Sequence, residues 1–107
     1  MRDAAETYQV IRSLAVDATI REILLQRERS SGRRGMERLL DALEGAFQTL
    51  GAFPFFGRAA DDRTLRERGY RKLRVAELIV VYRVEEDTRC VFITNIFYQR
   101  ENLEGLV

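Results

Sequence analysis

The sequence contains no histidine, and this absence excludes several kinds of active site. Histidine is the commonest acid–base group near neutral pH and the commonest metal ligand in proteins. With only one cysteine besides, a transition-metal site is not expected. Neither a Ser–His–Asp nor a Cys–His arrangement can form within one chain. We therefore expect no metal and no cofactor.

Cysteine and long apolar runs are also scarce. Cys90 is the single cysteine, so no internal disulfide can form, and its apolar surroundings indicate a small buried side chain. No run approaches the roughly 18 apolar residues of a membrane span. Met1–Thr7 lacks the apolar region of a signal peptide. We expect a cytoplasmic protein with no membrane partner.

The overall composition is that of a globular protein. The 107 residues are 46% apolar and 33% charged, which suits one domain spanning residues 1–107. The formal net charge is only +1, although 18 residues are Lys or Arg. A site for a polyanion would therefore need local clustering of these cations.

Three strand-like runs dominate the second half of the chain. Tyr70–Val75, Leu78–Val84 and Cys90–Tyr98 are rich in Val, Ile, Tyr and Phe, which favour strands. The breaks between them, Ala76-Glu77 and Glu85–Thr88, are short and polar. Short connections join antiparallel neighbours, so the pattern predicts a meander.

The first half of the chain predicts a short strand and two helices. Tyr8–Arg12 alternates weakly as a strand would, and Ser13 is a suitable N-cap for a helix from Leu14 to about Arg29. After the break at Ser30–Gly32, a second helix carries one apolar stripe and ends at Gly51 in the C′ position. The stripe consists of Met36, Leu39, Leu40, Leu43, Phe47 and Leu50. The short connection predicts an antiparallel helical hairpin.

Two segments between the hairpin and the meander carry weaker signals. The phenylalanines around Pro54, in residues 52–57, are expected to close the end of the core. Arg58–Arg68 is charged and is expected to be a mobile loop anchored by Leu65. The order β-α-α-β-β-β predicts an α+β fold, with an N-terminal helical hairpin packed on one face of a small, mainly antiparallel curved sheet.

The two faces of the meander differ in an informative way. Successive side chains of a strand point to opposite faces. Leu78, Val80, Tyr82 and Val84 thus alternate with Ile79, Val81 and Arg83, and the last strand alternates Val91, Ile93, Asn95 and Phe97 with Phe92, Thr94, Ile96 and Tyr98. Both faces are largely apolar, yet two helices can cover only one. We predict that the second face, with Ile79, Val81 and Arg83, binds a partner or a second copy of the chain.

The meander also resembles a known family. The run G-Y-R-K-L-R-V-x-x-x-x-V-V-Y-R-V-x-E-x-x-x-x-V-x-I-x-x-I-x-Y-x-R, preceded by L-x-x-F-P at Leu50, Phe53 and Pro54, resembles the RelE/ParE superfamily of bacterial toxins. The resemblance implies a growth-inhibiting toxin of a type II toxin–antitoxin system. It also implies a cognate antitoxin whose C-terminal segment wraps around the toxin as its partner.

The resemblance leaves two targets open. RelE-like members cleave mRNA in the ribosomal A site, whereas ParE-like members poison DNA gyrase. The positions that match the catalytic residues of the ribonucleases are Lys72, Arg74 and Arg100, with Arg83 and Tyr98 as further candidates. Ile79 stands where ribonuclease members tend to carry an arginine, and no tyrosine follows Arg100. These departures favour the ParE-like branch, in which the protein itself is not an enzyme.

The residue chemistry permits the ribonuclease alternative without requiring it. Arg74, Arg83 and Arg100 could stabilise charge on a phosphorane, because a guanidinium matches phosphate oxygens. Lys72 could act as base or acid, with Glu77 or Glu101 as alternatives. A further alternative is a non-toxic binding module that keeps the fold and the antitoxin contact.

Overall fold

The computed structural model describes residues 7–99, and these form an α+β fold. The elements in chain order are β1 (Gln9–Arg12), α1 (Leu14–Ala52), β2 (Arg58–Ala59), α2 (Arg63–Glu67), β3 (Tyr70–Val75), β4 (Leu78–Glu85) and β5 (Cys90–Tyr98). The five strands make one sheet in the order β1-β5-β4-β3-β2. Only β1 runs parallel to its neighbour, so the sheet is mainly antiparallel, as predicted.

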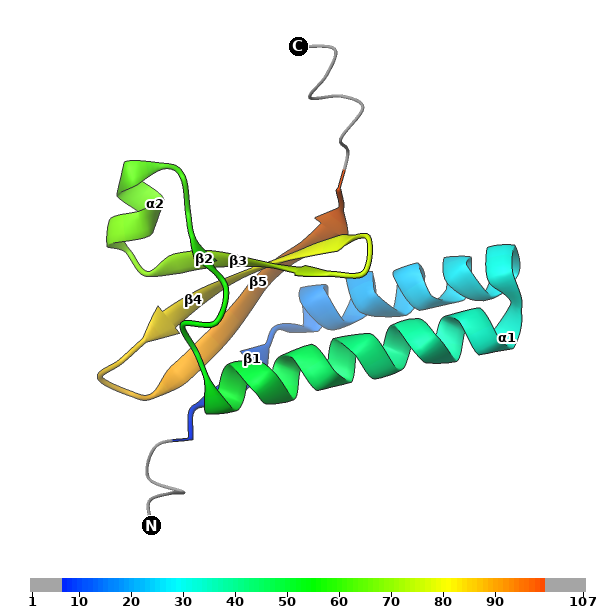
Figure 1. The fold of residues 1–107 in the computed structure, drawn as a ribbon, viewed down its shortest axis with the longest axis horizontal. Helices are drawn as coiled ribbons and strands as arrows, with labels where there is room; N and C mark the ends of the chain where they lie inside the picture. The colour runs from blue at the N-terminus through cyan, green and yellow to red at the C-terminus, as the bar shows by residue number, and fades with distance from the viewer. Residues whose placement is uncertain (1–6, 100–107) are drawn as a thin grey trace.

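The predicted helical hairpin is present, because the range labelled α1 consists of two helical arms that meet at Gly32. Ser13 is the N-cap of α1, with a side chain that accepts a hydrogen bond from Val16 N at 3.1 Å. Gly32 interrupts the helix with φ 79° and ψ 179°, a conformation open essentially to glycine alone. The two arms on either side of Gly32 run back along each other on one side of the sheet (Figure 1).

The core lies between the two arms of α1 and one face of the sheet. The predicted stripe of the second arm supplies Leu39, Leu43, Phe47 and Leu50. The sheet contributes alternate residues of β4 together with β5 residues, namely Leu78, Val80, Tyr82, Val84, Val91, Ile93 and Ile96. Burial of each large apolar side chain contributes about 1.5–3 kcal/mol. An ion pair between Arg27 and Glu77 also joins the first arm to the β3–β4 turn.

The predicted end of the second helix was wrong by two residues. Gly51 is buried inside the helix, and Phe53 is the C-cap. Gly51 O accepts a hydrogen bond from Tyr8 N at 2.8 Å, and a Cβ on Gly51 would lie 3.2 Å from Tyr8 O. The glycine therefore allows the chain before β1 to approach the helix closely.

The segment from Arg58 to Arg68 is ordered, contrary to the prediction of a mobile loop. It contains β2, paired with β3, and the short helix α2. Asp62 caps α2 by accepting a hydrogen bond from Leu65 N at 3.0 Å. Leu65 is 42% exposed, so it does not anchor the segment in the core.

The predicted alternation of the last strand was also wrong in its second half. The pairing of β4 with β5 shifts register between Val81 and Tyr82, which leaves Thr94 as the extra residue of a bulge. Thr94 Oγ1 donates a hydrogen bond to Val81 O at 3.2 Å. Beyond the bulge Ile96 is buried in the core, whereas Phe97 is 48% exposed on the other face.

The phenylalanines that follow α1 do not close the core. Phe53, Phe55 and Phe56 are 65%, 49% and 63% exposed. The backbone of this segment is bonded to the sheet, because Gly57 N donates a hydrogen bond to the buried Tyr82 Oη at 2.8 Å. Among the described residues, no helix is long and apolar enough to cross a membrane.

Candidate functional site: the open face of the sheet

The face of the sheet turned away from α1 is a regular surface built by strand register. We call it the open sheet face. Its side chains form three rows across β3, β4 and β5: Arg74–Ile79–Phe97, Lys72–Val81–Asn95 and Tyr70–Arg83–Phe92. Arg58 of β2 extends the middle row beside Lys72.

The centre of the open sheet face is apolar. Ile79 and Val81 are half-buried, and Phe97 beside Ile79 is 48% exposed. The long stems of Lys72 and Arg74 lie next to them in the same rows and cover part of their area. Because α1 packs on the opposite face, the prediction that this second face carries apolar residues outside the core is correct.

Cations flank the apolar centre on β3 and at Arg83 of β4. Lys72 Nζ lies 3.6 Å from Asp61 Oδ2, and Arg74 Nε donates to Ala76 O at 3.1 Å. The Arg83 guanidinium lies over the Phe92 ring, 4.8 Å from its centroid. The rows themselves contain no carboxylate, since Asp61 is in the loop after β2 and Glu85 ends β4. The open sheet face therefore suits a ligand with apolar and anionic groups.

Glu85 limits this positive surface at one end. Thr88 Oγ1 donates to Glu85 Oε1 at 2.7 Å, and Arg83 Nη1 lies 3.5 Å from Glu85 Oε2. The hydrogen bond from Thr88, followed by the interaction with Arg83, lowers the pKa of Glu85 from its ordinary value. Glu85 thus stays ionised and partly offsets the charge of Arg83.

The structure brings some of the predicted site residues together and separates others. Lys72, Arg74 and Arg83 share the open sheet face with Ile79 and Val81. Tyr98 lies opposite Leu78 and packs against the core, so it is on the other face. Arg100 lies outside the described residues.

Sequence reasoning missed four members of the open sheet face, and Asn95 was misplaced for the same reason as Phe97. Phe97 was assigned the same side as Ile93, and only knowledge of the bulge corrects this. Phe92 pairs with Arg83, and its strand position could have placed it on this face. Arg58 was part of the expected loop, and a strand of two residues leaves no recognisable pattern.

The chemistry of the open sheet face is that of binding. The charged groups of its rows are guanidinium and ammonium groups, and a guanidinium is a poor base because it holds its proton too tightly. Within residues 7–99, no cluster of His, Cys, Asp and Glu could hold a metal ion. The cations can instead fix carboxylate or phosphate groups.

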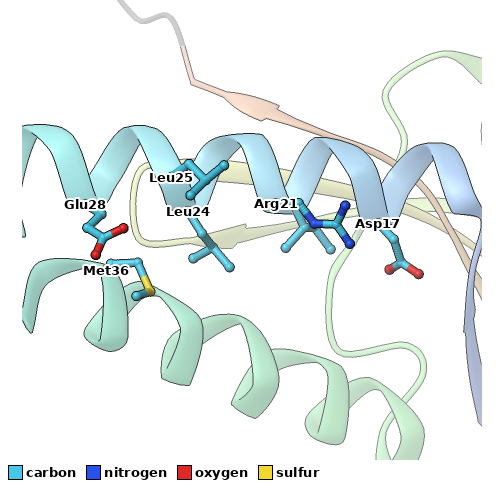
Figure 2. A pocket seen from close by; sticks show the side chains of 7 residues that line it. Asp17, Arg21, Leu24, Leu25, Glu28 and Met36 are labelled. Atoms are coloured by element: carbon cyan, nitrogen blue, oxygen red, sulfur yellow. The ribbon is translucent and has the colours of Figure 1, made fainter. Parts of the chain in front are cut away.

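A second surface lies along the arms of α1. An open groove of about 400 Å³ is lined by Asp17, Ile20, Arg21, Leu24, Leu25, Glu28 and Met36. Figure 2 shows these side chains. Leu24 and Met36 come from opposite arms and lie between them in this view. The groove rim carries both signs of charge, and Asp17 is already paired with Arg12 at 2.6 Å. The groove has no chemical preference comparable to that of the open sheet face.

Two solved structures resemble this fold across nearly the whole chain. One, described as the chromosomal ParDE TA system from P. aeruginosa, has a TM-score of 0.71 at 13% identity and covers 89% of this chain and 99% of its own. The other, the toxin–antitoxin complex RelBE2 from Mycobacterium tuberculosis, has a TM-score of 0.60 at 18% identity, covering 92% and 98%. The fold is therefore one that occurs in toxin–antitoxin complexes.

The sequence itself identifies the family. Residues 10–103 match the model of the ParE toxin of the type II toxin–antitoxin system parDE. The chain belongs to this ParE toxin family. No curated protein matches the sequence. The resemblance to the RelE/ParE superfamily is thus confirmed.

Proposed function

We propose that this toxin inhibits growth by acting on DNA gyrase, and that a cognate antitoxin neutralises it by covering the open sheet face. Membership of the ParE toxin family supports the first part. The observation that carries the second is the apolar centre at Ile79, Val81 and Phe97, flanked by cations on β3 and β4, on the face that α1 leaves free.

The rows of the open sheet face indicate what the antitoxin segment must offer. Ile79 and Phe97 stand beside Arg74, and Val81 stands beside Lys72. An antitoxin segment with apolar side chains over β4 and β5 and carboxylates over β3 would match both features. Such a segment would bury Phe97, and aromatic residues at the centre of an interface often dominate its affinity.

The ribonuclease alternative has less support from the same residues. General acid–base catalysis requires a group that gains and loses a proton near neutral pH. The described rows of the open sheet face offer Lys72, which is ion-paired with Asp61, and arginines. The apolar row Ile79–Phe97 next to Arg74 favours a protein ligand over an RNA phosphate.

The proposed antitoxin-binding surface can be tested by substituting one residue of its apolar centre and one of its flanking cations in separate variants. Phe97→Ser removes the exposed ring, and Lys72→Glu reverses the charge of the middle row. We expect each to weaken antitoxin binding by roughly 30-fold, the loss that corresponds to about 2 kcal/mol at a binding hot spot. Titration calorimetry with the product of the adjacent reading frame measures this.

A matched control is available on α1. Leu14 is 87% exposed and lies outside the open sheet face, so Leu14→Ser should bind the antitoxin as the wild type does. If Phe97→Ser and Lys72→Glu both bind within twofold of the wild type, the antitoxin lies elsewhere. A homodimer through the same face would instead appear as a concentration-dependent mass that Phe97→Ser abolishes.

The target is tested by two readouts after induced expression. Gyrase action predicts DNA breaks covalently linked to gyrase and loss of supercoiling activity in a purified assay. The ribonuclease alternative predicts mRNA cleavage that the double change Lys72→Ala and Arg100→Ala abolishes. If neither gyrase-linked DNA breaks nor mRNA cleavage occur and growth is normal, the protein is a non-toxic binding module that has kept only the antitoxin contact.

A further inference from the structure

The segment after α1 exposes three aromatic rings on one short turn. We call residues 53–56 the aromatic turn. Phe53, Phe55 and Phe56 are 65%, 49% and 63% exposed, whereas Pro54 between them is buried. Exposed apolar side chains are common singly, but three on one turn form a patch of the kind that marks binding surfaces.

The aromatic turn is held in place by its backbone. Phe53 N donates to Thr49 O at 2.6 Å, and Phe56 N donates to Phe53 O at 3.0 Å. Arg71 of β3 donates from Nη2 to Phe55 O at 3.2 Å and from Nε and Nη2 to Gly57 O at 3.0 and 2.8 Å. These bonds orient the rings outward before any partner arrives, which lowers the entropy cost of binding.

The chain at the end of the aromatic turn, at Gly57, lies very close to β3 and β4. A Cβ at this position would lie 2.4 Å from Lys72 O and 2.6 Å from Tyr82 Oη. Only glycine therefore lets the chain lie this close to β3 and β4. The rings project from a rigid base, because both ends of the turn are fixed, one by α1 and the other by β3 and Tyr82.

The aromatic turn and the open sheet face lie on different sides of β3. Neighbouring residues of a strand point to opposite faces. Lys72 belongs to the open sheet face, whereas Arg71 points the other way and holds the turn. A polypeptide lying on the open sheet face would have to cross the sheet edge to reach the rings. The two surfaces can therefore serve different partners.

The exposed rings alone are too small an area to form a stable interface. A fully buried aromatic side chain covers about 150–250 Å². With the exposed fractions above, the three rings offer roughly 350 Å². A stable interface needs about 800 Å² from each partner. The aromatic turn therefore suits the anchor region of a larger contact made with another protein.

The charges near the turn indicate the chemistry of that protein. Arg71 lies over Phe55, 5.4 Å from the ring centroid, and its Nε and Nη2 are bonded to backbone carbonyls, which limits its use as a ligand for a nucleic-acid phosphate. The exposed Arg58 follows the turn directly, and residues 58–72 carry six cations against three carboxylates. The surroundings thus favour an apolar protein segment with adjacent carboxylates.

We propose that the aromatic turn is the surface by which the toxin docks on its protein target, through an apolar segment of gyrase flanked by acidic residues. This inference rests on the function proposed above and adds the toxin surface that engages the enzyme. Toxicity and neutralisation then depend on separate surfaces of one small protein.

The test compares gyrase inhibition with antitoxin binding in the same variants. The triple change Phe53→Ser, Phe55→Ser and Phe56→Ser removes the rings and leaves the backbone contacts of Arg71 and Tyr82. The single change Phe56→Glu introduces a charge that should repel the proposed carboxylates. We expect each variant to lose at least tenfold in potency against purified gyrase holoenzyme in a supercoiling assay, with unchanged antitoxin affinity.

Two controls make every outcome decisive. Leu14→Ser removes an even more exposed apolar side chain elsewhere and should inhibit gyrase as the wild type does. Thermal unfolding and antitoxin affinity verify that the variants are folded. If the wild type and both variants inhibit gyrase within twofold of one another, the proposed target stands and the docking role of the aromatic turn is refuted. If the wild type itself leaves gyrase active, the proposed target fails and this inference fails with it.

Discussion

Removal of one buried hydroxyl should measurably destabilise the fold. The Tyr82 side chain is fully buried in β4, and its Oη accepts the hydrogen bond from Gly57 N at 2.8 Å. Tyr82→Phe keeps the ring and the packing of the core but removes the acceptor. The Gly57 N–H then loses its acceptor in a tightly packed place, where a Cβ on Gly57 would lie 2.4 Å from Lys72 O.

The expected magnitude follows from the loss of this acceptor. An unsatisfied buried donor costs about 1–3 kcal/mol, more than the hydrogen bond itself contributes. We therefore expect the free energy of unfolding to fall by about 2 kcal/mol. For a chain of this length the same loss lowers Tm by roughly 8–16 °C.

The assay is equilibrium unfolding in urea, followed by circular dichroism. The midpoint should fall while the slope stays constant, because the unfolded surface is unchanged. Alkaline pH gives a second reading. Burial raises the pKa of Tyr82 above its ordinary 10.0, so its contribution to stability is complete below pH 10 and is lost as the pH rises through the folded-state pKa. Tyr82→Phe should remove this part of the alkaline loss.

The matched control is Tyr70→Phe, on the open sheet face. The Tyr70 hydroxyl has no hydrogen-bond partner within residues 7–99, so its removal should change stability by less than about 0.5 kcal/mol. If Tyr82→Phe is equally mild, the Gly57 N–H finds another acceptor. The reasoning that this bond holds the aromatic turn against the sheet would then be wrong.

Two further changes test other parts of the fold. Gly32→Ala should lower the free energy of unfolding by about 1–3 kcal/mol in a urea titration, because alanine is strained in the backbone conformation of Gly32. A Cβ there would meet nothing within 4 Å, so no steric clash adds to this cost. An unchanged midpoint would mean that the kink relaxes. Arg71→Lys loses the forked contact to Gly57 O and Phe55 O. The free energy of unfolding should fall by about 1–2 kcal/mol, and amide hydrogen exchange in the aromatic turn should become faster. Unaltered exchange at Gly57 would show that Arg71 does not hold the turn.

Periodicity predicted most of the fold correctly. The apolar stripe from Leu39 to Leu50 and the alternation from Leu78 to Val84 each show one strong period, and both occupy the core as expected. Ser13 was recognisable as an N-cap because its side chain precedes a helical pattern. These features depend on local sequence, so a single chain suffices to find them.

The errors have identifiable physical causes. The bulge at Thr94 depends on pairing with β4, and no local pattern announces it. The exposure of Phe55 follows from contacts with Arg71 and Tyr82, residues 16 and more positions away. The helix α2, in contrast, was missed although Asp62 is a good N-cap and Arg63 and Glu67 have the spacing of a helical ion pair.

The candidate site was predictable in part. The apolar and basic character of Ile79, Val81 and Arg83 follows from strand alternation alone, and so does their common face with Lys72 and Arg74. The roles of these residues stay predictions. The division of the aromatic residues between the open sheet face and the aromatic turn was not predictable. It depends on the bulge at Thr94 and on the close approach of Gly57 to Lys72 and Tyr82.

The pairing of the first strand with the last affects how a newly made chain can fold. Gln9 lies against Cys90, about eighty positions further along. During synthesis, β1 cannot pair until β5 has been made, because β5 is its one strand neighbour in the described part of the chain. The two arms of α1 can pack together before β5 is made, but at that stage the core still lacks Val91, Ile93 and Ile96. Translation that stops before β5 therefore releases a polypeptide whose core cannot be completed.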